Sequence, residues 1–283
     1  MSTILIADSG STKTEWRLLR QQKRNKTIFT QGLSPYFLTA EQIEAILRKE
    51  LLPSLPEGAP PTALFFYGTG NANPANARMI KGVLSKVFPG AEVEVRHDLM
   101  GAARALCGHE QGIACILGTG SNSGYYNGKA ITRNSPGLGY VLGDEGSGAY
   151  LGKRVLQYFL YDTFDEELRA RFESQYKVSG PEILDAVYKQ PLPNRYLASF
   201  AHFLSENRGH YMVENILEDG LNDFFFQHLC KYRESWSKPI HFIGGVAHAF
   251  KDVVRELGHS YEFEIGKIVQ APMDGLEAYH RAH

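Results

Sequence analysis

Residues 4–16 read ILIADSGSTKTEW, an apolar run that stops at Asp8 and becomes apolar again at Trp16 after a short polar turn. The first run is typical of a buried strand, and the alternation over residues 14–19 predicts a second strand beside it. Between them lie a carboxylate, a glycine, several hydroxyls and Lys13. Glycine lets a ligand approach the backbone, and successive backbone N–H groups with nearby hydroxyls form an anion-binding concavity. The stretch therefore predicts a strand–turn–strand unit that can hold an anion.

Length and composition limit the class of protein. A chain of 283 residues suits two domains rather than one small core. With 43% hydrophobic residues and a net charge of −1, nothing favours nucleic acid or an anionic membrane as a partner. No apolar run approaches the roughly 18–20 residues that span a bilayer, and no signal peptide is apparent. Cys107, Cys115 and Cys230 are isolated, so we expect neither a disulfide framework nor a thiolate metal site, and the cytoplasm is the default location.

The chain contains a second start that resembles the first. ACILGTGSNSGYY, at residues 114–126, again gives an apolar strand, a turn of Gly with Ser and Thr, and a further strand. Strands alternate with helices after each hairpin, which predicts an α/β fold with mixed sheets and an internal duplication. We expect an N-terminal domain over residues 1–110 and a C-terminal domain over 111–283. Most of residues 164–232 are expected to form a helical insertion, with the option that the last helix packs back on the first domain.

Three turns share one design, because each follows a buried strand and is rich in small residues. They are DSGST (8–12), GTGSN (118–122) and IGGVA (243–247). A P-loop is excluded, since Lys13 follows Thr12 at the wrong spacing and a strand rather than a helix comes next. A dinucleotide-binding glycine fingerprint fails in the same way at residues 118–120. Together the turns predict a site for a polyphosphate.

Carboxylates follow two further predicted elements. Asp98 ends the strand EVEVRHD and begins a helix, which places it at the carboxyl edge of the first sheet, where ligand sites of α/β proteins gather. A carboxylate there suits the role of general base. Asp144 and Glu145 precede a helix that starts with small residues, and both can accept protons of hydroxyl groups. The remaining histidines show no metal-binding spacing and are interpreted as ordinary core or surface residues; they are His202, His210, His228, His241 and His248.

Several of these stretches resemble one known family. ADSGSTKTEW, VRHDLMGAARA, CILGTGSNS, GLGYVLGDEGSGAYLG, HFIGGVA and APMDGLEAY run in family order over nearly the whole chain. The chain resembles the BadF/BadG/BcrA/BcrD ATPase family, which includes N-acetylglucosamine kinase, within the sugar kinase, heat-shock chaperone and actin ATPase superfamily. The resemblance implies two ribonuclease H-like domains in an actin-like ATPase architecture, with ATP in the cleft between them. It also implies an ATP- and Mg²⁺-dependent kinase that phosphorylates a hydroxyl of an amino sugar.

The resemblance assigns roles to individual residues. Asp8 is the expected Mg²⁺ ligand, directly or through water, and Asp98 is the expected catalytic base. The residues expected to bind ATP are Gly10, Ser11, Thr12, Lys13, Gly118, Thr119, Gly120, Gly244, Gly245 and Ala249. The residues expected to bind the sugar are Ser34, Tyr36, Ser121, Asn122, Gly137, Leu138, Gly139, Asp144 and Glu145.

The match weakens where the family contacts its sugar. Residues 32–39 read GLSPYFLT, which keeps Ser34 but replaces the rest of the family's segment, and Leu138 and Tyr140 stand where the family carries tryptophan and histidine. The sugar is therefore left open among amino sugars, related hexoses and muramic-type sugars, and a homodimer is left open too. Two other functions remain alternatives. One is an ATPase activator of a 2-hydroxyacyl-CoA dehydratase, and the other is a nucleotide-gated sugar sensor without enzymatic activity.

Overall fold

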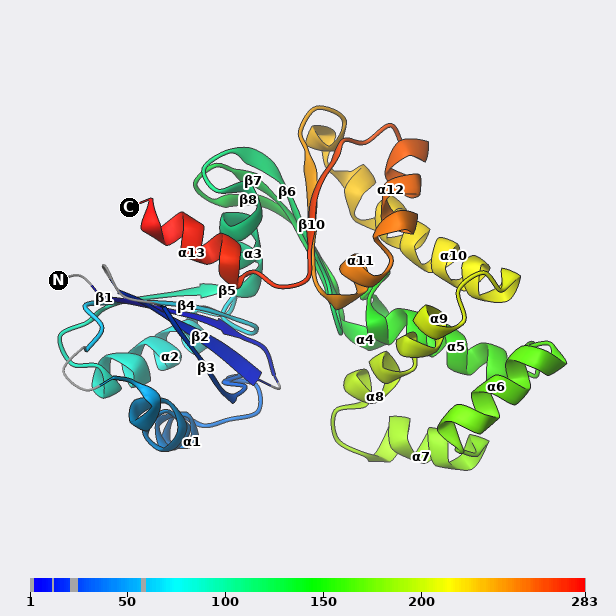
Figure 1. Cartoon of the computed structure of the whole chain (residues 1–283), viewed down its shortest axis with the longest axis horizontal. Coiled ribbons are helices and arrows are strands. Elements are labelled where there is room, and N and C mark those ends of the chain that lie inside the picture. Colours follow the sequence, from blue (N-terminus) through cyan, green and yellow to red (C-terminus); the bar gives the residue numbers. More distant parts are fainter. Residues whose placement is uncertain (1–2, 12, 21–24, 57–59, 283) are drawn as a thin grey trace. The chain divides into compact units, whose positions relative to one another are not determined.

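A computed structural model describes residues 3–11, 13–20, 25–56 and 60–282. The chain divides into two compact units (Figure 1). Unit 1 contains residues 1–109 together with 272–283, and unit 2 contains residues 110–271. Each unit is built on its own five-stranded sheet.

The sheet of unit 1 has the strand order β3-β2-β1-β4-β5. Strands β1, β4 and β5 run parallel, and β2 and β3 run antiparallel beside them, as expected of a hairpin that precedes βα units. The strands are β1 (Thr3–Ser9), β2 (Lys13–Arg20), β3 (Lys26–Gln31), β4 (Ala63–Gly68) and β5 (Glu92–His97). The helices are α1 (Ala40–Ile46), a π-helical turn (Leu47–Leu51), a 3₁₀ turn (Leu52–Ser54), α2 (Pro74–Val87), α3 (Asp98–Cys107) and α13 (Met273–Arg281).

The core of unit 1 forms because its strands alternate and its helices carry apolar stripes. Helix α2 starts at Asn73, whose side chain accepts from the N–H of Ala75, with Pro74 in the first turn. Trp16 is fully buried beside Phe66, and its Nε1 donates to Oγ1 of Thr30 at 3.0 Å. A buried indole needs that partner, because an unpaired N–H inside the core would be costly.

The last helix, α13, lies beside α3 in unit 1 (Figure 1). A side chain at Gly275 would overlap the backbone of Ala105, so glycine permits the close contact of the two helices. His280 is buried, and its Nε2 lies 2.9 Å from the hydroxyl of Tyr67 on β4. The end of the chain is therefore fixed to the sheet that carries Asp8.

The sheet of unit 2 has the order β10-β9-β6-β7-β8, which repeats the plan of unit 1. Strands β6, β9 and β10 run parallel, while β7 and β8 run antiparallel. The strands are β6 (Gln111–Leu117), β7 (Ser121–Asn127), β8 (Ile131–Pro136), β9 (Ile240–Ile243) and β10 (Ile265–Val269). This shared plan confirms the predicted α/β class with mixed sheets and agrees with the predicted duplication.

Helices fill the long interval between β8 and β9, as predicted. They are α4 (Gly139–Leu142), α5 (Gly148–Leu160), α6 (Glu166–Tyr176), α7 (Gly180–Lys189), α8 (Pro193–Ser199), α9 (Ala201–Glu206), α10 (Tyr211–Gln227) and two 3₁₀ turns (Leu229–Lys231 and Arg233–Trp236); α11 (Gly245–Ala249) and α12 (Lys251–Ser260) follow β9. Their core is rich in aromatic rings, with Phe172 in contact with Phe159, Phe200 and Phe203. These apolar contacts hold α5, which leads from the segment that contains Asp144 and Glu145.

Candidate functional site

Two of the predicted residues of unit 1, Asp8 and Asp98, lie at the carboxyl ends of parallel strands in one sheet. Ser9 pairs with Gly68, and Gly68 pairs with His97, so β1, β4 and β5 end side by side. Asp8 lies near the end of β1, Thr69 directly follows β4, and Asp98 directly follows β5. The N–H of Thr69 donates to the carbonyl of Ser9 at 3.1 Å, which joins the first two strand ends. This edge of the sheet therefore presents two carboxylates with a hydroxyl between them.

The ionised form of Asp8 is unfavourable in the folded protein. Burial, together with the negative charges of Asp98 and Glu15, raises its pKa to about 7, although Lys13 opposes the increase. A carboxylate with this cost of ionisation gains from a nearby cation. The described residues contain no group of three or more His, Cys, Asp or Glu side chains that could hold a metal on their own. Mg²⁺ is commonly bound by one or two carboxylates together with phosphate oxygens and water, so Asp8 beside Asp98 fits that ion.

Asp98 does not serve as the N-cap of the helix that it begins. The N-cap of α3 is His97, whose Nδ1 accepts from the N–H of Met100 at 3.3 Å, rather than Asp98 itself. Asp98 Oδ1 accepts from the N–H of Leu99 at 2.8 Å, and the hydroxyl of Thr69 donates to the same carboxylate. Burial raises the pKa of Asp98, while these two donors oppose the increase. Thr69 was missed in the sequence, although it follows a buried strand within a Gly-Thr-Gly turn.

The polar side chains in and around the turn after β1 fall into two groups, one buried and one exposed to solvent. Ser9 Oγ lies 2.8 Å from Oγ1 of Thr14 and accepts from the N–H of Leu33 at 3.1 Å. These buried hydroxyls fasten the turn to the end of β3. Ser11 and Lys13 are exposed instead, and the Lys13 ammonium lies 4.9 Å from the ring centroid of Phe29. The predicted contact of Thr12 with phosphate lies outside the described residues.

The predicted sugar contacts of unit 1 lie on the segment after β3. Ser34 is 1% exposed, and its Oγ has no hydrogen-bond partner among the described residues. Tyr36 is 64% exposed, and its ring packs so close to Gly70 that a Cβ at Gly70 would lie 2.9 Å from it. The Tyr36 segment thus contacts the loop after β4 that also contains Thr69. An unpaired buried hydroxyl is unusual in a protein core and marks Ser34 as a residue that can still accept a partner.

In unit 2, two of the predicted glycine turns contact each other. Gly244 has a φ of 125°, and a Cβ there would overlap the carbonyl of Leu117, so only glycine fits. The turn at Gly118 and Thr119 is fixed from the other side, because these carbonyls accept from the N–H groups of Gly148 and Ala149 at 2.8 and 3.0 Å. Gly120 borders the carboxylate of Asp144, Gly245 and Ala249 are exposed, and nothing would obstruct a Cβ at Gly245. The ends of β6 and β9 and the start of α5 therefore form one surface lined by backbone.

The segment 137–146 has an unusual backbone. Leu138, Gly139, Asp144 and Gly146 all have positive φ, with values of 63°, 79°, 57° and 69°. Left-handed backbone is unfavourable for leucine and tolerable for aspartate, and such residues cluster at functional sites. Helix α5 begins at Gly148 with Ser147 as its N-cap. Asp144 and Glu145 therefore lie in the turn that precedes this helix.

Asp144 occupies an enclosure of glycines. Its Oδ1 accepts from the N–H of Gly139 at 3.2 Å, and a Cβ at Gly137 would overlap this oxygen. A Cβ at Gly120 would lie 2.9 Å from Oδ2. Burial raises the pKa of Asp144, and backbone donors at Ser121 and Gly139 oppose the increase. Nearby, Ser121 Oγ is buried without a partner among the described residues, and Oδ1 of Asn122 accepts from Asn134 at 2.8 Å.

Glu145 is held by a buried histidine that the sequence interpretation treated as ordinary. His228 is 2% exposed, and its ring stacks on Phe224 at a centroid distance of 4.5 Å. Its Nε2 lies 3.1 Å from Oε2 of Glu145, while its Nδ1 lies 3.1 Å from the carbonyl of Ser135. No local spacing signals this contact, because Glu145 and His228 are far apart in the sequence.

Comparisons with known proteins agree with this arrangement. No protein-family model and no curated protein matches the chain. A "Putative N-acetylglucosamine Kinase" from Porphyromonas gingivalis is 38% identical, with 99% of each chain covered and a TM-score of 0.94. A second protein of that description, from Chromobacterium violaceum, is 19% identical with a TM-score of 0.74 and 99% of each chain covered.

The actin-like part of the predicted architecture is confirmed by a more distant neighbour. MreB5 of Spiroplasma citri, solved with ADP, has a TM-score of 0.60 at 9% identity, with 100% of this chain and 96% of that chain covered. No helix among the described residues is long and apolar enough to cross a membrane. With full coverage by a relative at 38% identity, the chain belongs to the N-acetylglucosamine kinase-like family of the BadF/BadG type, and its fold is actin-like.

Proposed function

We propose that this protein is an ATP-dependent sugar kinase that phosphorylates a hydroxyl of an amino sugar of the N-acetylglucosamine type. The observation that carries the proposal is the position of Asp8, Thr69 and Asp98 at the carboxyl ends of adjacent parallel strands. The description of the Porphyromonas gingivalis relative supports the choice of reaction and of substrate class. Phosphoryl transfer needs positioning, neutralisation of charge and a base for the acceptor hydroxyl, and these residues can supply the last two.

Asp98 is the proposed base. Its carboxylate takes the proton of the sugar hydroxyl as the oxygen of that hydroxyl attacks the γ-phosphorus of ATP, and the bond from this phosphorus to the bridging oxygen of ADP breaks. A raised pKa makes the ionised carboxylate a stronger proton acceptor. Thr69 donates to the carboxylate and fixes its direction. His97 caps the helix, so the base starts a well-ordered element.

Asp8 is the proposed residue that holds Mg²⁺, directly or through a water molecule. When bound, Mg²⁺ neutralises the charge that develops on the phosphate oxygens. The repulsion between Asp8 and Asp98 in the ligand-free protein supports this role, because a cation would relieve it. Lys13 supplies a further positive charge near Asp8 and is exposed toward solvent.

The three glycine turns are the proposed ATP-binding elements. Gly10, Ser11 and Thr12 with Lys13 would contact phosphate, and so would the turn of Gly118, Thr119 and Gly120. Gly244 and Gly245, with Ala249, would border the nucleoside. The exposure of Gly245 and Ala249 and the free space above Gly245 support this last assignment.

The proposed sugar-binding residues combine fixed carboxylates with unpaired hydroxyls. Asp144 and Glu145 would accept protons from sugar hydroxyls, since each is fixed by a separate set of donors. Ser34 and Ser121 have buried hydroxyls without partners among the described residues, which supports a role for a polar ligand that supplies them. Tyr36, Asn122 and the segment from Gly137 to Gly139 complete the proposed set.

A coupled assay of ADP release tests the function directly. The purified protein would be supplied with ATP and Mg²⁺ and with one sugar at a time, from a panel of hexoses, free amino sugars and N-acetylated amino sugars. We expect release of ADP that depends on the sugar, and a product heavier by one phosphate in mass spectrometry. ADP release that is equal with and without every sugar would show that the protein is not a sugar kinase. As a control, Asp274→Asn alters a carboxylate that is 93% exposed, and this variant should release ADP as wild type does.

A further inference from the structure

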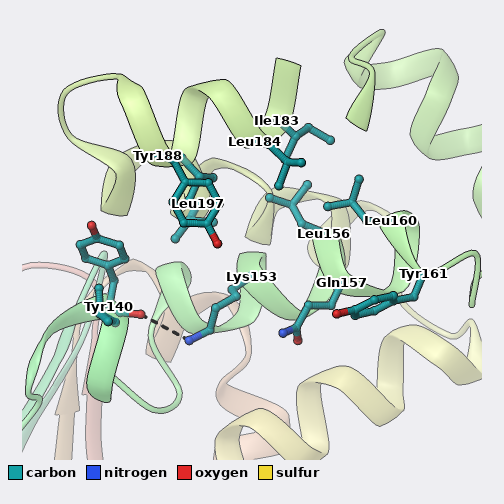
Figure 2. A pocket seen from close by; sticks show the side chains of 12 residues that line it. Tyr140, Lys153, Leu156, Gln157, Leu160, Tyr161, Ile183, Leu184, Tyr188 and Leu197 are labelled. Carbon is teal, nitrogen blue, oxygen red and sulfur yellow. Dashed lines mark hydrogen bonds between the residues drawn. The ribbon is translucent and has the colours of Figure 1, made fainter. Parts of the chain in front are cut away.

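Unit 2 contains a pocket of about 580 Å³ that the proposed reaction does not use. It lies among α4, α5, α7 and α8, and Figure 2 shows side chains from these helices converging on it. Its floor is apolar and buried, with Leu156, Ile183 and Leu197 at 4%, 1% and 4% exposure. This volume lies within the range of about 300–1,000 Å³ that is typical of small-molecule pockets.

The rim of the pocket is apolar but open to solvent. Tyr161 and Tyr188 are each 80% exposed, and Leu160 and Leu184 are 40% and 49% exposed. Figure 2 shows the Tyr161 side chain at the end of α5 and the Tyr188 side chain on α7. Tyrosine combines an apolar ring with a polar tip, so it suits the border between an apolar ligand and water. A cluster of this kind on a protein surface indicates a binding site.

One positively charged side chain lines this otherwise uncharged pocket. Lys153 is the single charged residue among those that line the pocket, and its side chain is half-buried. Its Nζ donates to the carbonyl of Tyr140 at 3.3 Å and lies 5.2 Å from the ring centroid of Tyr150. Within the described part of the chain, no carboxylate comes within 4.0 Å of this ammonium group. A half-buried ammonium with neutral partners alone favours an anion, because burial penalises an uncompensated charge.

We propose that this pocket binds a small amphipathic carboxylic acid. Its carboxylate pairs with Lys153, and its apolar tail lies on Leu156, Ile183 and Leu197. The complementarity of charge selects an acid over an alcohol or an amine of the same length. The volume and the buried floor select a small tail, which can be an alkyl chain or an aryl group. With either kind of tail, the carboxylate makes the same ion pair with Lys153.

Isothermal titration calorimetry of the full chain, without nucleotide or sugar, tests the binding. The probes are octanoate, 4-phenylbutyrate, octan-1-ol and octylamine, used separately. We expect one or both acids to bind at least about tenfold more tightly than the alcohol, and the amine not to bind. The two acids distinguish an alkyl from an aryl tail. Lys153→Met keeps the apolar stem and should reduce binding of the acid about tenfold, while binding of octan-1-ol stays the same.

Two further variants complete the test. Lys189→Met removes a lysine outside the pocket that pairs with Asp185, and it should bind all probes as wild type does. Leu184→Glu places a negative charge at the rim and should weaken binding of both acids. Equal binding of octanoate and octan-1-ol, or unchanged binding of the acids by Lys153→Met, would overturn the proposal. So would the absence of binding of both acids up to about 5 mM. A dimer in sedimentation that Leu184→Glu dissociates would assign the pocket to a second copy instead. These binding measurements use neither nucleotide nor sugar, so their outcome can be interpreted even if the protein shows no kinase activity.

Discussion

The Nε2 atom of His228 lies 3.1 Å from Oε2 of Glu145, and the opposite ring nitrogen lies 3.1 Å from the carbonyl of Ser135. The carbonyl can only accept, so Nδ1 carries a proton. The other ring nitrogen, Nε2, faces the carboxylate of Glu145. His228 thus fixes the direction of a proposed sugar-binding group.

His228→Gln should impair sugar binding more than catalysis. The glutamine amide can donate to Glu145 but cannot also replace the opposite ring nitrogen at the carbonyl of Ser135, so Glu145 is held less firmly. We expect the KM for the sugar to rise up to about tenfold, as for the loss of one hydrogen bond, with the KM for ATP unchanged. Steady-state kinetics with each substrate varied measures this. His210→Gln makes the same change at the other end of α10 and serves as control. An unaltered KM for the sugar in folded His228→Gln would contradict the role.

Asp8→Asn should stabilise the ligand-free protein while it abolishes the Mg²⁺-dependent reaction. The native pKa of about 7 exceeds the ordinary value of 3.8, so the native state binds the proton more tightly than the unfolded state does. Stability from this group is therefore full below pH 3.8 and is lost as the pH rises to about 7. Above pH 7 the shift corresponds to at most about 4 kcal/mol, which partial exposure reduces.

Denaturant unfolding in the presence of a chelator, at pH 5 and pH 8, measures this effect. We expect the variant to gain roughly 1–3 kcal/mol over wild type at pH 8 and less at pH 5. A variant that is less stable than wild type at pH 8 would show that the carboxylate is not strained in the folded protein.

Thr69→Val should slow the reaction without loss of substrate binding. Valine has the shape of threonine but lacks the hydroxyl that donates to Asp98. We expect kcat to fall roughly 5- to 50-fold, with both KM values within about threefold of wild type, because orientation of the base is lost. Thr69→Ser keeps the hydroxyl and should recover most of kcat. If serine and valine reduce kcat equally, the hydrogen bond to Asp98 has no role in the rate.

Gly137→Ala should disturb the enclosure of Asp144. The added Cβ would overlap Oδ1 of Asp144 and the carbonyl of Ser121, so the segment has to move. We expect a lower melting temperature and a KM for the sugar that is raised at least about tenfold. Gly82→Ala, in α2, meets no atom within 4 Å and should raise stability by about 0.5–1 kcal/mol. A Gly137→Ala protein with wild-type kinetics would mean that the position of Asp144 is unimportant for sugar use.

The strand ends could be predicted from the sequence because their signals are local. The apolar run before Asp8, the strand before Asp98 and the repeated glycine turns all lie within short windows, and each strand or turn formed where expected. The geometry of the hairpin between β7 and β8 is less evident from its Asn127-Gly128 pair. A type I′ turn would need positive φ at both residues, but of the two only Gly128 has it, and Asn127 Oδ1 accepts from the N–H groups of Lys129 and Ala130.

The hydrogen bonds that hold the site residues in place could not be predicted, because they join residues that are distant in the sequence. The contact of Glu145 with His228 spans 83 residues, and the contact of Ser123 with Tyr232 spans 109. No periodicity or spacing reports such pairs. The left-handed backbone at Leu138 is equally hidden, since leucine seldom adopts it and the surrounding packing imposes it.

The central claim is that Asp98 accepts the proton of the sugar hydroxyl, and single-turnover transfer of radiolabelled phosphate from ATP to the sugar by Asp98→Asn tests it most directly. We predict a rate about 10²–10⁴-fold below wild type, since the amide cannot act as a base, with the Kd of Mg·ATP within about threefold of wild type. Asparagine can still accept the hydrogen bond from Thr69, so the local structure should persist. Transfer by Asp98→Asn at the wild-type rate would contradict the account.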